Sequence, residues 1–267
     1  MPSASNLTAE SRFCALFVGP KHSGKTVAAC SFLKPLPSQS RLKVLDGDGR
    51  IRGILGAPWI EKDRIDYDYY PPKLADNDKT FFQRVNADLE VLLYNIQKGK
   101  NPYETYVGDS ATSFCRNLVL DAIPLTHQDG KGKSIGTMQM AGPADYGFES
   151  TGMDAYLSFL RSLPINVIVT AHVVDRYGKS NPNDPYSENI VIGEKLSLRD
   201  KISTNMSIYF DHIFRFDRVM QGGHERFFVE FINNIACTSF PNMPIGKQDI
   251  TGKAFYPYLM DLVGRKS

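Results

Sequence analysis

The sequence predicts an α/β protein with a central, mostly parallel β-sheet, flanking helices, and antiparallel strands toward the C-terminus. Short apolar runs that end in small or acidic residues alternate with longer segments of helical spacing, which is typical of parallel strands covered by helices. Beyond residue 207 the chain carries two aromatic, partly alternating runs joined by the hairpin-like segment Gln221-Gly222-Gly223-His224. The first pattern predicts the parallel core, and the second predicts the antiparallel strands.

The composition is that of one soluble globular domain spanning residues 1–267. Hydrophobic residues make up 42% of the chain and charged residues 22%, which is enough for a full core. Residues 1–11 are expected to form a flexible N-terminus without the pattern of a secretory signal, and no run approaches the roughly 18 apolar residues of a membrane span. We therefore expect a cytoplasmic protein with no membrane contact. A net charge of +2 does not by itself indicate nucleic acid.

Individual elements follow from the same patterns. The expected parallel strands are Arg12–Val18, Leu42–Leu45, Tyr103–Val107 and Ile165–Thr170, and the expected antiparallel strands are Ile208–Val219 and Arg226–Ile235. The expected helices are Lys25–Leu33, Asp78–Gln97, Ser110–Ile123 and Thr151–Ser162. Two polar stretches rich in glycine or proline, 127–146 and 174–203, are expected to be long functional loops.

A phosphate-binding loop is indicated between the first strand and the first helix. The segment GPKHSGKT fits the pattern G-x-x-x-x-G-K-[ST], in which backbone N–H groups surround a phosphate and a lysine reaches the outer phosphates. The start of the following helix adds its positive end to the same anion. The residues predicted to bind the nucleotide are Gly19, Pro20, Lys21, His22, Ser23, Gly24, Lys25, Thr26 and Val27.

Magnesium is the expected companion of this loop. The Thr26 hydroxyl is the predicted first ligand, and Mg²⁺ bound this way usually needs a carboxylate at the end of a neighbouring strand. Asp109 ends the extended run Thr105–Val107 and precedes a predicted helix, so we assign it to the metal. The alternative is that Asp109 only caps that helix.

Hydrolysis also requires a group that orients or deprotonates water. Two acids, Asp46 and Asp48, follow the second strand, and we prefer Asp48 for this role, with Asp46 second. The alternative is a simple Asp/Gly turn. His172 ends the strand Ile165–Thr170 with a polar side chain and could sense the terminal phosphate, although a lone histidine often has only a structural role.

Taken together, these residues resemble the RecA-like P-loop ATPase core, and more narrowly the phage nucleotide-binding proteins of that class, including the Sak-type single-strand-annealing recombinases. The resemblance is carried by FVGPKHSGKT, KVLDGDGR, YVGDSATSF and INVIVTAH, and it covers about residues 12–175. In RecA-like proteins the second strand ends in D-x-E, whose last acid is catalytic. Asp48 takes that place with a shorter side chain. His172 falls where the family carries a polar residue that couples nucleotide state to DNA binding.

The resemblance also implies that both long loops face single-stranded DNA. The basic residues expected to contact the DNA are Lys131, Lys133, Arg176, Lys179, Arg199 and Lys201, and Tyr177 and Tyr186 are candidates for base stacking. However, residues 127–201 contain eight Lys/Arg against nine Asp/Glu, so a solvated loop of mixed charge is the alternative.

RecA-like subunits commonly receive a cation from a neighbour during phosphoryl transfer. The segment Cys237-Thr238-Ser239-Phe240 lacks one where the family would place it, which leaves four substitutes: Arg215, Arg218, Arg226 and Lys247. For the base and ribose of the nucleotide the candidates are Arg50, Arg52 and Tyr256.

The leading hypothesis is a Mg²⁺-dependent ATPase of phage recombination, replication or repair that binds single-stranded DNA. Its expected cofactors are ATP and Mg²⁺, and its expected partners are single-stranded DNA, further copies of the chain in a homo-oligomer or filament, and a single-strand-binding protein. Two alternatives stay open: a nucleotide or small-molecule kinase with the same phosphate loop, and an ATP-dependent loader or assembly factor with weak hydrolysis.

Overall fold

The structure, a computed structural model, describes most of the chain. The described residues are 12–33, 39–53, 56–58, 60–70, 79–126, 134–135, 138–181, 183, 186–232, 244 and 246–262. The expected flexible N-terminus, Lys131, Lys133 and the segment Cys237-Thr238-Ser239-Phe240 lie outside them. No helix in the described part of the chain is long and apolar enough to cross a membrane.

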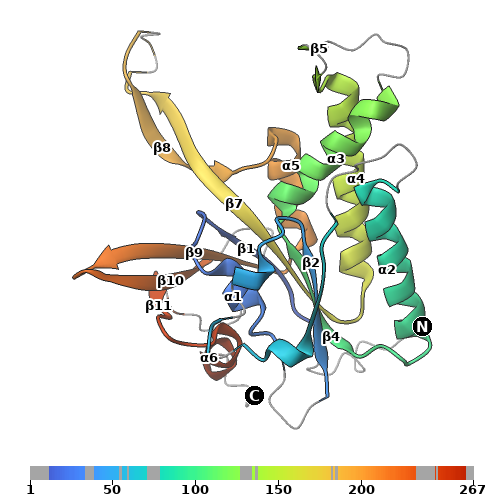
Figure 1. Cartoon of the computed structure of the whole chain (residues 1–267). Helices are drawn as coiled ribbons and strands as arrows, with labels where there is room; N and C mark the ends of the chain where they lie inside the picture. The colour runs from blue at the N-terminus through green and yellow to red at the C-terminus, as the bar shows by residue number, and fades with distance from the viewer. Residues whose placement is uncertain are drawn as a thin grey trace, which may run out of the picture.

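The helices and strands alternate along the chain as the sequence predicts (Figure 1). The strands are β1 (Cys14–Gly19), β2 (Arg41–Asp46), β3 (Ile65–Asp68), β4 (Tyr103–Asp109), β5 (Ser134–Ile135), β6 (Met138–Gln139), β7 (Asn166–Lys179), β8 (Asn189–Leu196), β9 (His212–Gln221), β10 (His224–Ile232) and β11 (Lys247–Asp249). The helices are α1 (Lys25–Ala29), α2 (Phe81–Gln97), α3 (Ala111–Thr126), α4 (Pro143–Ser162), α5 (Asp200–Asn205) and α6 (Phe255–Leu262).

One large sheet organises the described residues. Its strand order is β11-β10-β9-β1-β7-β4-β2-β3, and β8 pairs with β7 off this path. The pairs from β9 through β1, β7, β4 and β2 to β3 are parallel, whereas β10 and β11 add antiparallel strands at one edge. This confirms the expected α/β class with a mostly parallel sheet and antiparallel strands toward the C-terminus.

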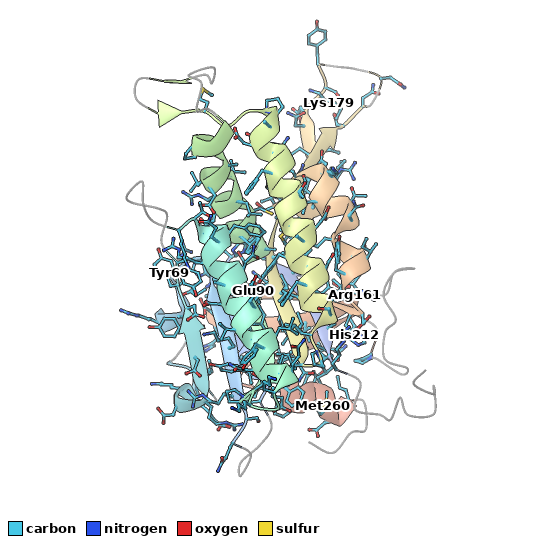
Figure 2. The ribbon with its side chains drawn as sticks, turned by 90° about the vertical axis from the view of Figure 1, so that its right-hand side faces the viewer. Tyr69, Glu90, Arg161, Lys179, His212 and Met260 are labelled. Atoms are coloured by element: carbon cyan, nitrogen blue, oxygen red, sulfur yellow. The ribbon has the colours of Figure 1, made fainter. Side chains whose placement is uncertain are left out.

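The two faces of the sheet bury two separate sets of side chains because successive residues of a strand point to opposite faces. In β1, Leu16 joins a cluster formed with residues of α2, α3 and α4, whereas Phe17 joins a cluster formed with α1 and α6. Figure 1 shows these two layers of helices on opposite sides of the sheet, and Figure 2 shows α2 and α4 lying side by side over one face. The strand with the phosphate loop is thus fixed from both sides.

All four predicted helices differ in length from the prediction, and α1 and α4 differ most. Helix α1 ends at Ala29 rather than at residue 33. Just after this end, the Ser31 hydroxyl donates to the Ala28 carbonyl at 2.6 Å and accepts from the Tyr256 N–H at 2.9 Å. Helix α4 begins at Pro143, eight residues before the predicted start, because proline suits the first turn of a helix and the Asp145 carboxylate accepts from the Gly142 N–H at 2.6 Å. The last part of the expected loop 127–146 is therefore helical.

The stretch 174–203 is not a loop, contrary to the prediction. Strand β7 runs on to Lys179, turns, and returns as β8, with paired residues from Val173–Leu196 to Lys179–Asn189, and α5 follows. Figure 1 shows this two-stranded β7–β8 ribbon projecting from the body of the molecule. Neither face of the ribbon is buried against a helix, so its sequence lacks the alternation of apolar and polar residues that reveals a strand.

Candidate nucleotide-binding site

The phosphate loop joins the end of β1 to the start of α1, and two glycines allow its backbone to turn. Gly19 is held so close to β9 that an added Cβ would lie 2.1 Å from the Phe216 carbonyl oxygen. Gly24 has a φ of +87°, a conformation that side chains rarely adopt. The two glycines therefore fix the curved backbone whose N–H groups bind phosphate in such loops.

Lys25 lies at the centre of this loop and is buried. Its ammonium group donates to the carbonyl oxygens of Gly19 at 3.0 Å and Pro20 at 2.7 Å. Burial lowers the pKa of Lys25 to about 8, although the nearby carboxylates of Asp109 and Asp48 raise it. A phosphate oxygen would give this partly desolvated cation a charged acceptor in place of the two carbonyls.

Asp109 joins three neighbouring segments at the end of β4. Its carboxylate accepts hydrogen bonds from the hydroxyl of Thr26 at 3.0 Å and from the hydroxyl of Thr170 in β7. Burial raises the pKa of Asp109, and the two hydroxyl groups act in the opposite direction. The cap of α3 is instead Ser110, whose hydroxyl oxygen accepts from the Ser113 N–H at 3.3 Å.

The Thr26–Asp109 pair fits the magnesium ion that such loops bind. A hydroxyl and a carboxylate oxygen are the hard ligands that Mg²⁺ prefers, and Mg²⁺ usually takes only one or two protein groups beside phosphate and water oxygens. Thr26 and Asp109 would hold the ion next to the phosphate loop. When bound, Mg²⁺ neutralises charge on the phosphate oxygens.

The two acids after β2 have different roles in the structure. The carboxylate of Asp46 is 1% exposed and accepts from the backbone N–H groups of Arg50 at 3.1 Å and Ile51 at 2.9 Å. Asp48 instead accepts a hydrogen bond from the Ser113 hydroxyl and lies 3.7 Å from Nε2 of His172. Asp46 therefore holds the turn, which leaves Asp48 as the candidate for orienting water.

The electrostatics of Asp48 favour an ionised carboxylate. Its interaction with His172 is the strongest influence and lowers the pKa of Asp48, burial acts in the opposite direction, and the Ser113 hydroxyl lowers the pKa further. A carboxylate with a low pKa is a weak proton acceptor. It can still accept a hydrogen bond from water and fix the direction of its attack.

His172 lies between the phosphate loop and the β7–β8 ribbon. In the parallel register of β1 and β7 it is paired with Gly19, the first residue of the loop pattern. Its backbone N–H donates to the Thr112 hydroxyl at 3.1 Å, and its carbonyl accepts from the Ser197 N–H at 2.7 Å. Its side-chain Nδ1 atom is buried without a hydrogen-bond partner among the described residues.

These residues meet in one cavity of about 600 Å³, which we call the nucleotide cavity. The predicted residues that line it are Lys21, His22, Ser23, Gly24, Lys25, Thr26, Val27, Asp48, Arg50, Asp109 and His172. Gly53 and Phe227 line it as well. The four residues that we expected to be catalytic, which come from four separate segments, are thus brought together.

Sequence reasoning missed Phe227 and Ser113, besides Gly53, at this site. Phe227 comes from β10, and its ring would be 3.3 Å from a Cβ added at Gly24. Nothing in the sequence relates an aromatic residue of a late strand to the phosphate loop. Ser113, the hydroxyl donor to Asp48, stands within the YVGDSATSF motif, but its role depends on the path of the turn after β2.

Two of the three candidates for base and ribose contacts lie outside the cavity. Arg50 lines it, whereas the guanidinium group of Arg52 donates to the Tyr67 hydroxyl at 3.2 Å. The Tyr256 ring packs against Phe32 with centroids 4.7 Å apart. The structure therefore keeps only Arg50 as a candidate for the nucleotide.

All four cations considered as substitutes for a trans-acting residue form ion pairs within their own chain. Arg215 pairs with Glu194 at 2.7 Å and with Asp217 at 3.3 Å. The other pairs are Lys247–Asp217 at 2.6 Å, Arg218–Glu225 at 3.1 Å and Arg226–Asp249 at 3.1 Å. Lys21 and Arg50 already line the nucleotide cavity, so two cations besides Lys25 are available from the same chain.

The described candidates for DNA contact fall into two groups. Arg176, Lys179 and Tyr177 lie on β7 within the ribbon, and Tyr186, which is 94% exposed, lies in the turn that joins β7 to β8. Arg199 and Lys201 lie at the start of α5, at the base of the same ribbon. Figure 2 labels Lys179 at one end of the molecule.

Comparison with known proteins agrees with the phosphate loop. Residues 11–230 match a protein family described as an AAA domain. The chain belongs to this AAA-domain family. With its phosphate loop and the Thr26–Asp109 pair, this AAA-domain protein is a P-loop ATPase, the broad class that the sequence predicts. No curated protein matches its sequence.

Two solved structures are distantly similar to this AAA-domain protein. A KaiC-like protein from the hyperthermophilic archaeon Pyrococcus horikoshii is similar with a TM-score of 0.49 and 11% identity, over 88% of this chain and 83% of the other. The flagellar accessory protein FlaH from Methanocaldococcus jannaschii is similar with a TM-score of 0.41 and 13% identity, over 88% of each chain.

We expect ATP affinity to fall as the pH rises through about 8, where Lys25 loses its proton in the free protein. A bound phosphate stabilises the charged lysine and raises its pKa, so ATP binding at pH 8.5 should take up protons. Isothermal titration calorimetry in two buffers of different ionisation enthalpy measures this uptake.

The variant Lys25→Ala should bind ATP about tenfold or more weakly, because a hydrogen bond to a charged group is lost. The same variant should take up no proton on binding ATP. Uptake that persists in Lys25→Ala would assign the proton to another group.

A second prediction separates the two acids after β2. Asp48→Asn keeps the size of the side chain but removes its charge, and it should slow ATP hydrolysis by about a hundredfold or more with little loss of stability. Asp46→Ala leaves two backbone N–H groups without their acceptor and should lower the free energy of unfolding by about 1–3 kcal/mol. Steady-state ATPase rates and urea denaturation measure the two effects. The assignment is wrong if Asp46→Ala slows hydrolysis without loss of stability.

Proposed function

We propose that this P-loop ATPase binds single-stranded DNA in phage recombination, replication or repair in the host cytoplasm, and that its ATP state controls DNA binding through the β7–β8 ribbon. The observation that supports this most is the position of His172. It contacts Asp48 in the nucleotide cavity and is hydrogen-bonded through its carbonyl to Ser197, next to the end of β8. The narrower relationship to Sak-type recombinases remains part of this proposal.

In the proposed reaction, water attacks the γ-phosphorus of ATP, and the bond to the β-phosphate oxygen breaks to give ADP and phosphate. Asp48 orients the water, and Lys25, Lys21 and Arg50 stabilise the negative charge that develops on the phosphate oxygens. Loss of the γ-phosphate changes the surroundings of the Asp48–His172 contact. Because His172 is part of β7, such a change reaches the ribbon through the backbone.

The ribbon offers both kinds of group that single-stranded DNA requires. Arg176 and Lys179 supply positive charge, and Tyr177, which is 62% exposed, supplies a ring on which a base can stack. Acidic residues also occur on the ribbon, including Asp175 and Glu194, so the charge is mixed as the sequence indicates. The proposal therefore rests on the position of the ribbon rather than on a basic patch.

We also propose that the protein acts as a homo-oligomer or filament and works with a single-strand-binding protein. The ribbon exposes three consecutive aliphatic residues, Ile190, Val191 and Ile192, by 45%, 54% and 52%. Several exposed apolar residues gathered on one strand commonly mark an interface. A second copy of the chain is the partner that we assign to them.

Single-stranded DNA is expected to stimulate ATP hydrolysis. ATPase rates with and without an unstructured 30-nucleotide strand measure the effect of DNA on hydrolysis. Fluorescence anisotropy with ATP, with ADP and without nucleotide measures the effect of the nucleotide on DNA binding.

The double variant Arg176→Ala, Lys179→Ala should bind DNA more weakly. The slope of its log binding constant against log salt concentration should become smaller in magnitude by about 0.7 for each lost phosphate contact. Lys98→Ala, Lys100→Ala, at the end of α2 opposite the ribbon, is the matched control. Absence of DNA binding in every nucleotide state would refute the proposed function.

Sedimentation velocity should show assemblies larger than the monomer in the presence of ATP. Val191→Glu places a charge on the aliphatic part of the ribbon and should shift the protein toward the monomer. Val91→Glu, on the exposed face of α2, is the control, because Val91 is 59% exposed and lies far from the ribbon. A wild-type protein that remains monomeric with every nucleotide would contradict the oligomer.

A further inference from the structure

A second cavity of about 570 Å³ adjoins the nucleotide cavity. It lies among residues of α3, α4 and the base of the β7–β8 ribbon. Lys21, Asp48, Arg50 and His172 line both cavities, so the two share a wall. A ligand in the second cavity would therefore lie beside the Asp48–His172 contact.

Cations outnumber carboxylates around this second cavity. Its lining cations are Lys21, Arg50, Arg116, Lys195 and Arg199, whereas the lining carboxylates are Asp48 and Glu149. Asp48 is already engaged by Ser113 and His172, and Lys195 pairs with Asp200 at 3.3 Å at the surface. Lys21 and Arg50 also serve the nucleotide cavity, which leaves Arg116 and Arg199 against Glu149 here, and this excess of positive charge suits an anionic ligand.

Arg199 is held in a defined orientation at this cavity. Its guanidinium carbon lies 3.5 Å from the centroid of the Tyr146 ring. A guanidinium group stacked on an aromatic ring offers a planar surface, and unstacked bases commonly stack on such planes. The cavity thus combines positive charge with a planar group.

Glu149 is the residue that distinguishes this cavity from a simple basic groove. It lies on α4 and is 4% exposed, and its Oε2 atom has no hydrogen-bond partner among the described residues. The nearest cation is Arg199, whose Nε atom is 3.9 Å away, beyond hydrogen-bond distance. A buried carboxylate oxygen without a donor is costly, so this atom is suited to an N–H group brought by a ligand.

The ligand must therefore carry negative charge for the cations and an N–H donor for Glu149. A cationic side chain of a partner protein meets only the second requirement, and inorganic phosphate meets only the first. A nucleotide of a DNA strand meets both, because its backbone phosphate is anionic and the exocyclic amine of cytosine or adenine is a donor that carboxylates accept.

We propose that the second cavity binds one nucleotide of single-stranded DNA and prefers cytosine or adenine to thymine. The exocyclic amines of cytosine and adenine donate to Glu149, whereas the one ring N–H of thymine lies between two carbonyl oxygens that the carboxylate repels. This inference rests on the proposed function, since it specifies how the same protein reads the strand. The phosphate of the nucleotide lies against Arg116 and the other cations, and the base extends toward α4. Occupancy of the cavity places the strand next to His172 and thus next to the nucleotide cavity.

The test compares fluorescein-labelled 20-nucleotide oligo-dC and oligo-dT by anisotropy in the presence of a non-hydrolysable ATP analogue. Both are pyrimidine strands that stack weakly, and only cytosine has the amine. The wild-type protein should bind oligo-dC about fivefold or more tightly. An oligo-dC strand with N4,N4-dimethylcytosine keeps the base but loses both N–H donors, and it should bind like oligo-dT, a result that needs no protein variant.

Protein variants test the same contact by changing Glu149 instead of the base. Glu149→Gln adds a side-chain amide that can donate to thymine, so the preference for oligo-dC should disappear or reverse. Glu90→Gln, at an exposed position of α2, is the matched control and should keep the preference (Figure 2). Arg116→Ala should weaken both strands to the same extent, because phosphate contacts carry no sequence information.

The possible outcomes separate the inference from the function on which it rests. If both homopolymers bind equally, and neither the methylated strand nor Glu149→Gln changes binding, DNA binding stands and the assignment of the second cavity is wrong. If neither homopolymer binds in any nucleotide state, the proposed function fails and the inference fails with it.

Discussion

The site depends on one buried carboxylate, that of Asp109. Its two oxygens accept from Thr26 beside the phosphate loop and from Thr170 in β7, so a single group connects β4 to β7 and to the start of α1. Burying a carboxylate is unfavourable unless its oxygens are hydrogen-bonded, and the two hydroxyl groups meet that need. The same arrangement places two oxygen atoms of the kind that Mg²⁺ binds next to the loop that holds phosphate. A requirement of folding and a requirement of chemistry are thus met by the same contacts.

The parallel part of the sheet and most of the site could be predicted because both follow from local patterns. A parallel strand buried on both faces is a short apolar run, and the polar residue that ends it faces the edge where ligands bind. Asp109 and His172 were found in this way and Lys25 from the pattern of the phosphate loop, and the structure brings all three into one cavity. The edge strand β3 was missed, since only Ile65 among its four residues is buried and no apolar run marks it.

The choice between Asp46 and Asp48 shows where sequence reasoning ends. Both acids lie at the same strand end. Only the path of the next five residues decides which carboxylate accepts hydrogen bonds from backbone N–H groups. The β7–β8 ribbon was missed for a different reason. A ribbon with solvent on both faces has no core to specify its pattern, and the sequence of residues 181–185, rich in proline and asparagine, is typical of an ordinary loop. Arg199, expected only as a DNA contact, also lines the cavity beside Glu149, a relation between α4 and α5 that no sequence spacing reveals.

The hydrogen bond between Ser197 and the carbonyl of His172 gives the ribbon a mechanical property. It secures the return strand at the point where the ribbon leaves the sheet, so a tilt at His172 would carry both strands together. At about 3.3 Å per residue, the six steps from Val173 to Lys179 make an arm of roughly 20 Å. A tilt of about 5° at the base of an arm of that length would move its tip by roughly 2 Å. A change too small to alter the fold around the phosphate loop is therefore large enough, at the tip, to make or break a hydrogen bond.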